Sequence, residues 1–398
     1  MSRILIVGGS LGGLMAANVL LREGFEVTVL EKAASSLDGR GAGIVTHRPL
    51  VDALTLCGVP IDASLGVAID QRVTLDQQGQ IIAQAHMPQV LTSWSRLYAL
   101  LLEALPKAMY MNGAALVSFT QDEHGVRVVC EDGRTFEGDV LIASDGIRSV
   151  VRAAVAPEVK AQYAGYVAWR GVCDEAVLSQ HTLNTVFETF GFGLPAGEQL
   201  IGYPVAGLEN SVTQGRRRYN FVWYRPAPEG QALQSLMTDA DGVHHPLGLP
   251  PNKVSWRHLA DARLAAREKL APQFAEIMEK TAQPFLQPIY DCYSSRLAFG
   301  RVALMGDAAF VARPHVGMGV TKAAQDAVAL RDALKLHGTQ PAALKAYESQ
   351  RLMDGQAVVE RGRRLGAYMQ ASAGGHEVLR DAKAVMAQTA IDLSTKPN

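Results

Sequence analysis

The fold of this 398-residue chain is decided by the turn Gly8-Gly9-Ser10-Leu11-Gly12-Gly13. This turn lies within the stretch ILIVGGSLGGLMAANVLLREGFEVTVLE, which runs from Ile4 to Glu31. The apolar run before the glycines is typical of a strand buried on both faces of a parallel sheet. Leu14, Ala17, Leu20 and Leu21 follow at helical spacing, and Gly24 stands where a helix would end. The stretch therefore predicts a strand, a tight turn, a helix and a second strand.

The residues of this turn fit a dinucleotide site. Gly8 permits the tight turn, and Gly13 lets the helix pack closely on the strand. Ser10 replaces the usual middle glycine, but it is small enough for a pyrophosphate to approach and it can donate a hydrogen bond. The helix N-terminus favours the anion. Glu31 can accept from ribose hydroxyls and would repel a 2′-phosphate, which favours FAD or NAD over NADP. The alternative is a purely structural turn.

Three later motifs extend the cofactor hypothesis toward FAD. Asp145-Gly146-Ile147-Arg148-Ser149 follows a buried strand, although Asp145 alone could be an ordinary helix cap. Gly306-Asp307-Ala308-Ala309 follows another, and its carboxylate could bind a polyol such as the ribityl chain of flavin. Pro314-His315-Val316-Gly317-Met318-Gly319 precedes a long helix, whose first N–H groups would stabilise negative charge on a reduced flavin ring.

The order of patterns predicts an α/β fold: a Rossmann-like FAD-binding domain, an inserted antiparallel β-sheet substrate domain and a long C-terminal helix. We expect the FAD-binding domain over 1–72, 91–162 and 288–394, and the substrate domain over 73–90 and 163–287. The substrate domain has strand-like runs at Val167–Val172, Leu200–Val205 and Tyr219–Tyr224. Helices are predicted over Gly319–His337 and Pro341–Met369, and disorder after about Ser394.

Composition excludes several classes of protein. The 38 basic residues nearly balance the 39 acidic ones, which argues against a nucleic-acid-binding surface. The four cysteines lack CxxC spacing, and the histidines are not spaced as metal ligands. The sequence shows neither a secretory pattern nor an apolar stretch long enough to cross a membrane. We expect a soluble, cytoplasmic protein without a metal site.

With these motifs in order, the chain resembles the single-component FAD-dependent aromatic hydroxylases, which share the fold of para-hydroxybenzoate hydroxylase. The resemblance runs from Arg3 to about Met369. It is closest to the members that hydroxylate dihydroxypyridines, a likeness carried by four stretches: Gly41–Val45, Tyr163–Val172, Met237–Asp239 and Arg313–His315.

The resemblance implies a set of FAD-binding residues: Gly8, Ser10, Leu11, Gly13, Glu31, Lys32, Gly43, Arg96, Asp145, Asp307, Pro314, Gly317, Gly319 and Val320. Arg96 matches the family arginine near the pyrophosphate; the alternative is an arginine on the surface of a helix. The segment from Gly317 to Thr321 would face the flavin ring. Two positions depart from the family pattern: Phe310 replaces a common histidine, and Thr321 a common asparagine.

Family chemistry implies that NADH or NADPH reduces FAD, and that O2 then forms a C4a-hydroperoxide which hydroxylates an electron-rich ring. The substrate would be a small hydroxylated N-heteroaromatic, dihydroxypyridine-like, or phenolic ring. A polar group should contact it. His315, His47 and Tyr203 are the candidates, each with a structural alternative as a hydrogen-bonded or core residue.

Some alternatives stay open. In the strand Tyr219–Tyr224, alternation puts Phe221 and Trp223 on one face and Val222 and Tyr224 on the other, without showing which face lines the pocket. A flavin oxidase or dehydrogenase of an amine or alcohol, or a non-catalytic flavin redox sensor, would also fit the cofactor motifs. A homodimer is implied by resemblance alone.

Overall fold

β1 (Arg3–Val7) holds an inner position in a six-stranded sheet. The computed structural model of the chain describes residues 2–35, 37, 43–246, 248–370 and 380–392. The strand order is β16-β17-β10-β1-β2-β6. β1 runs parallel to β2 (Glu26–Leu30) and β10 (Val140–Ala143), and β10 runs parallel to β17 (Val302–Leu304). The outer strands are β6 (Tyr110–Met111), parallel, and β16 (Ala298–Phe299), antiparallel. Because parallel strands end at one edge, turns far apart in sequence meet there.

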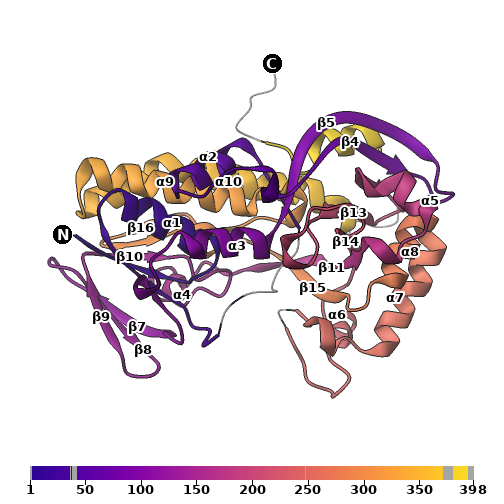
Figure 1. Cartoon of the computed structure of the whole chain (residues 1–398). Helices are drawn as coiled ribbons and strands as arrows, with labels where there is room; N and C mark the ends of the chain where they lie inside the picture. Colours follow the sequence, from indigo (N-terminus) through magenta and orange to yellow (C-terminus); the bar gives the residue numbers. More distant parts are fainter. Residues whose placement is uncertain (1, 36, 38–42, 247, 371–379, 393–398) are drawn as a thin grey trace.

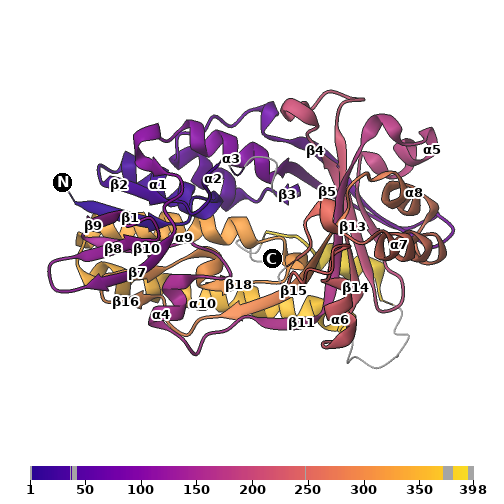
Figure 2. The ribbon, with the colours of Figure 1, turned by 90° about the horizontal axis from the view of Figure 1, so that it is seen from below.

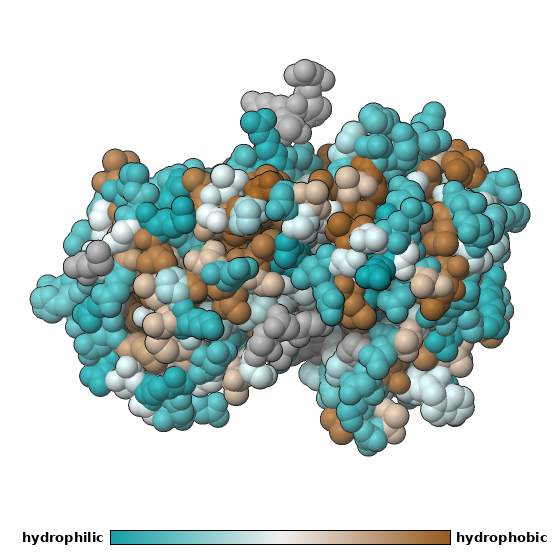
Figure 3. Space-filling model, viewed as in Figure 1, coloured by the Kyte–Doolittle hydropathy of each residue, from teal (hydrophilic) through white to brown (hydrophobic). Residues whose placement is uncertain are grey.

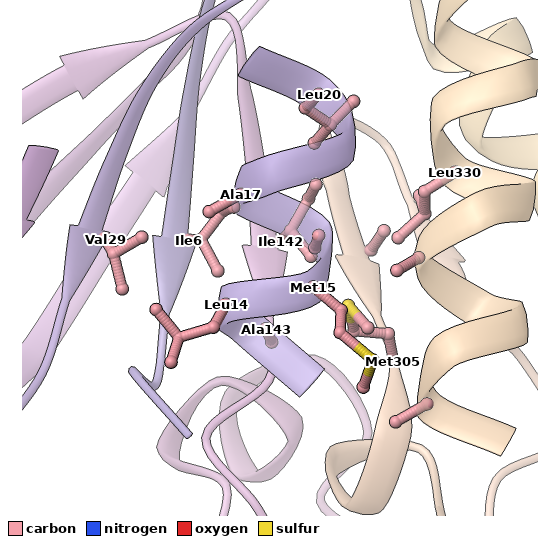
Figure 4. Packing of buried hydrophobic residues seen from close by; sticks show 14 of the residues in the cluster. Ile6, Leu14, Met15, Ala17, Leu20, Val29, Ile142, Ala143, Met305 and Leu330 are labelled. Atoms are coloured by element: carbon pink, nitrogen blue, oxygen red, sulfur yellow. The ribbon is translucent and has the colours of Figure 1, made fainter. Parts of the chain in front are cut away.

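Helices cover this sheet on one face (Figure 1). α1 (Leu11–Arg22) lies between the sheet and α9 (Gly319–His337), which in turn packs on α10 (Pro341–Gly366). Figure 4 shows Leu14 and Ala17 of α1 directed at Ile6 and Val29 of the sheet, with Leu330 of α9 on the far side of the helix. The apolar spacing that predicts α1 thus buries one stripe on the sheet and another on α9.

The remaining elements of this half are short. They are α2 (Arg48–Leu56), α3 (Trp94–Glu103), α4 (Val150–Val155), and a three-stranded antiparallel sheet of β7 (Leu116–Gln121), β8 (Val126–Cys130) and β9 (Thr135–Gly138).

A nine-stranded sheet forms the other half, in the order β18-β15-β11-β14-β13-β12-β4-β5-β3. Its strands are β3 (Gly43–Val45), β4 (Val67–Leu75), β5 (Ile81–Ser93), β11 (Gln162–Asp174), β12 (Phe190–Gly193), β13 (Gln199–Val205), β14 (Arg218–Pro226), β15 (Phe285–Tyr293) and β18 (Phe310–Val311). Its helices are α5 (Gln180–Thr182), α6 (Gln231–Leu236), α7 (Trp256–Lys269) and α8 (Pro272–Lys280). In Figure 2 this sheet stands between α7 and α8 on its outer side and the six-stranded half on its inner side.

The two faces of β14 are now distinguished. Phe221 and Trp223 pack in the apolar cluster that contains residues of α7 and α8. Val222 and Tyr224 belong to the cluster on the inner face, which looks toward the six-stranded half. Tyr224 therefore lies on the side from which a cofactor bound at the six-stranded sheet would be approached.

The predicted fold class is confirmed: an α/β sheet with covering helices, a second β-rich unit and a long C-terminal helix. The predicted helix over Gly319–His337 matches α9, and the second predicted helix is α10 followed by a short 3-10 turn to Met369. The nine-stranded sheet takes in more chain than 73–90 and 163–287, because β4 begins at Val67 and β15 ends at Tyr293. Gly41, Ala42 and the tail after Ser394 lie outside the described residues.

The packing of α1 leads to a stability prediction. Leu14 is fully buried, so Leu14→Ala should lower the free energy of unfolding by about 2–5 kcal/mol through lost apolar burial and a cavity. Leu336→Ala on α9 is the matched control, because that side chain is 76% exposed and should change stability by less than about 0.5 kcal/mol. Urea unfolding of both FAD-free variants measures the difference, and equal losses would contradict the packing described.

Candidate functional site

The glycine turn after β1 leaves no room for side chains. Gly8 has φ +99°, and a Cβ there would lie 2.3 Å from the carbonyl oxygen of Ser144. A Cβ at Gly13 would lie 1.9 Å from the carbonyl oxygen of Gly8. These approaches bring the first turn of α1 directly against the ends of β1 and β10. The N–H groups of that turn therefore point at whatever occupies this edge of the sheet.

Glu31, at the end of β2, is held in place by backbone donors. Its Oε2 accepts from the N–H of Gly9 at 2.8 Å, and its Oε1 accepts from the N–H of Ala33 at 2.8 Å. The side chain is buried. Each carboxylate oxygen has a second lone pair, so both can still accept from ribose hydroxyls.

A cavity of about 360 Å³ opens at this edge, and Glu31 lines it. The other lining residues include Gly8, Ser10, Lys32, Leu37, Trp94, Leu116, Asp145 and Arg148. Ser10 precedes α1, but its hydroxyl does not cap the helix, so it is free to bind a phosphate. In Figure 3, apolar side chains gather below α3 on this half, whereas the outer rim is mostly hydrophilic.

Asp145 uses one carboxylate oxygen at the start of α4, and its role at the cofactor stays a prediction. Its Oδ2 accepts from the N–H of Val150 at 2.8 Å and so caps α4. Its Oδ1 is buried and has no hydrogen-bond donor among the described residues. Burial raises the pKa of this carboxyl above its ordinary value, while the hydrogen bonds from Ser149, Val151 and Val150 oppose the rise. A buried acceptor without a donor is costly, and a ligand hydroxyl or amide would satisfy it.

Asp307 follows β17, the parallel neighbour of β10, and so lies at the same edge as Asp145. Its side chain is 54% exposed, and the Nζ of buried Lys322 lies 4.0 Å from its Oδ1. Desolvation by the surrounding protein raises the pKa of the Asp307 carboxyl, and the charge of Lys322 opposes that rise. An exposed carboxylate at this edge of the sheet can accept hydrogen bonds from the hydroxyls of a polyol chain.

The turn before α9 is open beside Gly319, whereas Ala390 lies against Gly317. Gly317 has φ +65°, and Gly319 begins α9 with no atom within 4 Å of the place a Cβ would take. The 19-residue helix therefore begins at a position with room beside its backbone, and no side chain of its N-cap residue bonds its first N–H groups. The residues present fit FAD: a cradle for the diphosphate at α1, an acidic acceptor at Glu31, and a helix N-terminus for the ring.

His315 is fully buried on the inner face of the nine-stranded sheet. Its Nε2 lies 2.8 Å from the hydroxyl of Tyr166, and its ring lies 4.0 Å from that of Tyr224. Its Nδ1 has no partner among the described residues. Burial lowers the pKa of His315 well below its ordinary value, helped by the charges of Arg380 and Arg313, so the ring is neutral at pH 7.

His47 is the second buried histidine of this region. Its Nδ1 lies 3.0 Å from the hydroxyl of Thr321 at the start of α9, and its Nε2 has no partner among the described residues. Burial lowers its pKa, which the carbonyl of Ala390 and the charge of Asp392 partly offset. The departure from the family pattern at Thr321 thus has a structural use, because this hydroxyl binds His47.

Tyr203 lies in the same apolar cluster as Tyr224. A Cβ at Gly43 would lie 2.4 Å from the ring of Tyr203, so β3 passes close over it. Burial raises the pKa values of both tyrosines, and Arg170 opposes the rise. Both phenols are therefore neutral. The hydroxyl of Tyr224 has no partner among the described residues.

Arg96, a predicted site residue, and Phe310, a departure from the family pattern, both contact other parts of the protein. The Nε of Arg96 donates to the carbonyl of Ser64 at 3.0 Å, so its role at the pyrophosphate stays a prediction. Phe310 packs in the core, where a Cβ at Gly355 would lie 2.2 Å from its ring. The histidine common at this position would therefore be surrounded by apolar atoms.

Sequence reasoning missed Tyr166 and Arg170, which join this face from β11. Alternation along Tyr166-Val167-Ala168-Trp169-Arg170 would have placed both on one side of the strand. The buried residues after α10, such as Met386 and Ala390, were missed as well, since no motif marks them.

No group of three His, Cys, Asp or Glu side chains in the described residues is arranged to hold a metal ion. Within the same part of the chain, no helix has the length and apolarity needed to span a membrane.

The chain matches the family described as FAD binding domain over residues 1–187 and 248–362. It is 32% identical to 2,6-dihydroxypyridine 3-monooxygenase of Paenarthrobacter nicotinovorans, over 92% of this chain and 91% of that protein. It is 30% identical to aurachin C monooxygenase/isomerase of Stigmatella aurantiaca, over 91% and 88%. The solved structure of 2,6-dihydroxypyridine-3-hydroxylase from Arthrobacter nicotinovorans superposes with a TM-score of 0.87 at 31% identity, and 95% of each chain is covered.

The geometry of Glu31 leads to a prediction on cofactor affinity. Glu31→Gln keeps the shape but removes the charge and one of the two acceptor oxygens. The dissociation constant for FAD should rise about tenfold or more, because a hydrogen bond to a charged group contributes about 1.5–3 kcal/mol. Fluorescence titration of the apoprotein with FAD measures it. Glu23→Gln, at the far end of α1, is the control and should bind FAD as the wild type does.

Proposed function

Because the chain belongs to the FAD-binding-domain family of flavoprotein aromatic monooxygenases, we propose that it hydroxylates a small hydroxylated N-heteroaromatic ring. A dihydroxypyridine is the first candidate, and NADH or NADPH and O2 are the cosubstrates. A simple phenol is the second candidate within the same chemistry.

One observation carries this proposal: buried polar atoms without partners among the described residues lie on the inner face of the nine-stranded sheet, at His315 and Tyr224, and beside it, at His47 after β3. They are the Nδ1 of His315, the Nε2 of His47 and the hydroxyl of Tyr224, none of which has a hydrogen-bond partner among the described residues. Apolar and aromatic side chains, including Phe190 and Tyr203, surround them. A flat ring that carries hydroxyl and nitrogen groups would satisfy these atoms and fill the apolar surroundings.

The chain's own residues would then do three things. Gly8, Ser10 and Glu31 hold the ADP part of FAD, and Asp307 holds the ribityl chain. Bound FAD supplies the transfer of electrons from the nicotinamide and the activation of O2. The buried inner face excludes water from the reacting atoms.

His315 and Tyr224 would stabilise the anionic form of the substrate ring. When the hydroxyl of Tyr166 donates to Nε2, the proton of neutral His315 is on Nδ1, where it can donate to a ring oxygen. The phenol of Tyr224 offers a second donor. Donors aimed at a ring oxygen stabilise its negative charge. An anionic ring is richer in electrons at carbon, which is what an electrophilic oxygen transfer requires.

Anaerobic stopped-flow reduction of the FAD-loaded protein tests the proposal. NADH and NADPH are mixed in turn with the protein, with and without 2,6-dihydroxypyridine. We expect the flavin absorbance to bleach much faster with nicotinamide and the pyridine together, and air then to give hydroxylated product. Bleaching by an amine, alcohol or ring compound without nicotinamide would instead indicate an oxidase or dehydrogenase. No bleaching by nicotinamide with any ring of this class would contradict the proposal and favour a redox sensor.

The role of Tyr224 can be tested separately. Tyr224→Phe removes only the hydroxyl, so kcat/KM for the ring should fall about tenfold, in line with a hydrogen bond to a charged group. Tyr219→Phe is the matched control, because its hydroxyl is also buried and has no hydrogen-bond partner in the part of the chain that the structure describes, but lies on the opposite face of β14. Equal losses in the two variants would show that Tyr224 does not contact the ring.

A further inference from the structure

The segment Asp381–Asp392, which contains α11 (Ala382–Gln388), contacts both halves of the molecule. α11 packs on β4 and β5 of the nine-stranded sheet. Val385, Met386 and Ala390 are buried in the same apolar cluster as Tyr203 and Tyr224. The segment therefore forms part of the wall around the polar atoms assigned to the ring.

Arg72 of β4 anchors this segment. Its side chain is fully buried, and its Nη atoms donate to the carbonyls of Met386 and Thr389, both at 2.6 Å, and of Ala390 at 2.9 Å. The same guanidinium donates to the side-chain oxygen of Gln89 and lies 4.7 Å above the centre of the Phe190 ring.

The chemistry of these contacts suits an anchor. The last carbonyls of a helix have no partner within the helix, and a cation at that end interacts favourably with the helix dipole. Burial lowers the pKa of Arg72 to about 10, so it stays charged at neutral pH. A buried guanidinium whose hydrogen bonds go to several carbonyls loses its compensation if the segment moves away.

The anchored segment in turn touches the turn before α9. The N–H of Ala390 donates to the carbonyl of His315 at 3.0 Å. Ala390 has φ +50°, which is unfavourable for alanine, and a Cβ at Gly317 would lie 2.7 Å from its Cα and Cβ. Two more contacts secure the segment, from Arg361 to the carbonyl of Gln388 and from the N–H of Arg48 to Asp392.

We propose that Asp381–Asp392 is part of the ring-binding site and that Arg72 is a positioning residue for it. By holding the carbonyls of Met386, Thr389 and Ala390, Arg72 keeps Ala390 against Gly317 and His315, and so sets the distance between the flavin-facing turn and the ring. This inference rests on the proposed hydroxylation, which it extends to residues outside every motif of the sequence.

Loss of this positioning has a defined chemical consequence. In the coupled reaction, ring–H, NADH, H⁺ and O2 give ring–OH, NAD⁺ and H2O. When the ring is misplaced or water enters, NADH, H⁺ and O2 give NAD⁺ and H2O2, and no oxygen atom is transferred. The share of NADH electrons that leaves as H2O2 therefore reports the placement of the ring.

The test compares Arg72→Met with Arg217→Met. Arg217, directly before β14, is also a buried arginine, but it pairs with Glu175 and Glu188. Hydrogen–deuterium exchange is measured on the FAD-free and FAD-loaded proteins for peptides covering 381–392 and 313–321. In Arg72→Met we expect faster exchange in both peptides, a larger H2O2 share per NADH, and a loss of kcat/KM of about 10- to 100-fold, the effect of an ångström-scale misplacement. Arg217→Met should leave both peptides and the H2O2 share unchanged.

Wild-type exchange in the 313–321 peptide of Arg72→Met would overturn the inference, as would equal H2O2 shares in the two variants. If Arg72→Met does not fold, Arg72→Lys keeps the buried charge but offers a single nitrogen to the three carbonyls, and the same two measurements apply. If the wild-type protein hydroxylates none of the rings tried, the proposed function fails on that result alone. The exchange data on FAD-free protein would still show whether Arg72 positions the His315 turn.

Discussion

The structure depends on one steric constraint, the contact between backbone atoms at the turn after β1. Only glycine at positions 8 and 13 lets α1 begin against the ends of β1 and β10, because a Cβ at either position would overlap a carbonyl oxygen. This contact aims the first N–H groups of α1 at the edge where β2, β10 and β17 also end. Glu31, Asp145 and Asp307 then collect at that edge from segments far apart in the chain.

Burial governs the chemistry of the second half. The inner face of the nine-stranded sheet holds neutral histidines and neutral phenols, because desolvation lowers the pKa of a histidine and raises that of a tyrosine. Neutral hydrogen-bond donors among apolar side chains can stabilise negative charge on a ring. They do so without burying a second charge, which would itself need solvation. On the same face, polar atoms such as the Nδ1 of His315 and the hydroxyl of Tyr224 have no partner among the described residues. The hydroxyl and nitrogen groups of the proposed ring would supply the missing hydrogen bonds.

The two halves are joined where the reacting ring would lie. β18 and β15 bring the residues just before the α9 turn to the edge of the nine-stranded sheet, and Asp381–Asp392 packs on that sheet from the end of the chain. The turn that carries His315 is thus held by the six-stranded half through α9 and by the other half through Tyr166 and Ala390. Its position depends on both halves, which couples the site assigned to the cofactor to the site assigned to the ring.

The sequence by itself determined the cofactor half. The period of apolar residues predicts β1, α1 and β2, and α9 begins and ends at the predicted residues, because local spacing and glycine positions encode these elements. The family and its FAD cofactor followed from three motifs in order. Only the tertiary structure decided which face of β14 looks inward, since alternation is symmetric until helices α7 and α8 cover one side. It also decided the partners of Thr321, Arg96 and Arg72, which lie tens to hundreds of residues away and leave no local pattern. Contacts of that range arise when the chain packs, and no spacing within a single segment records them.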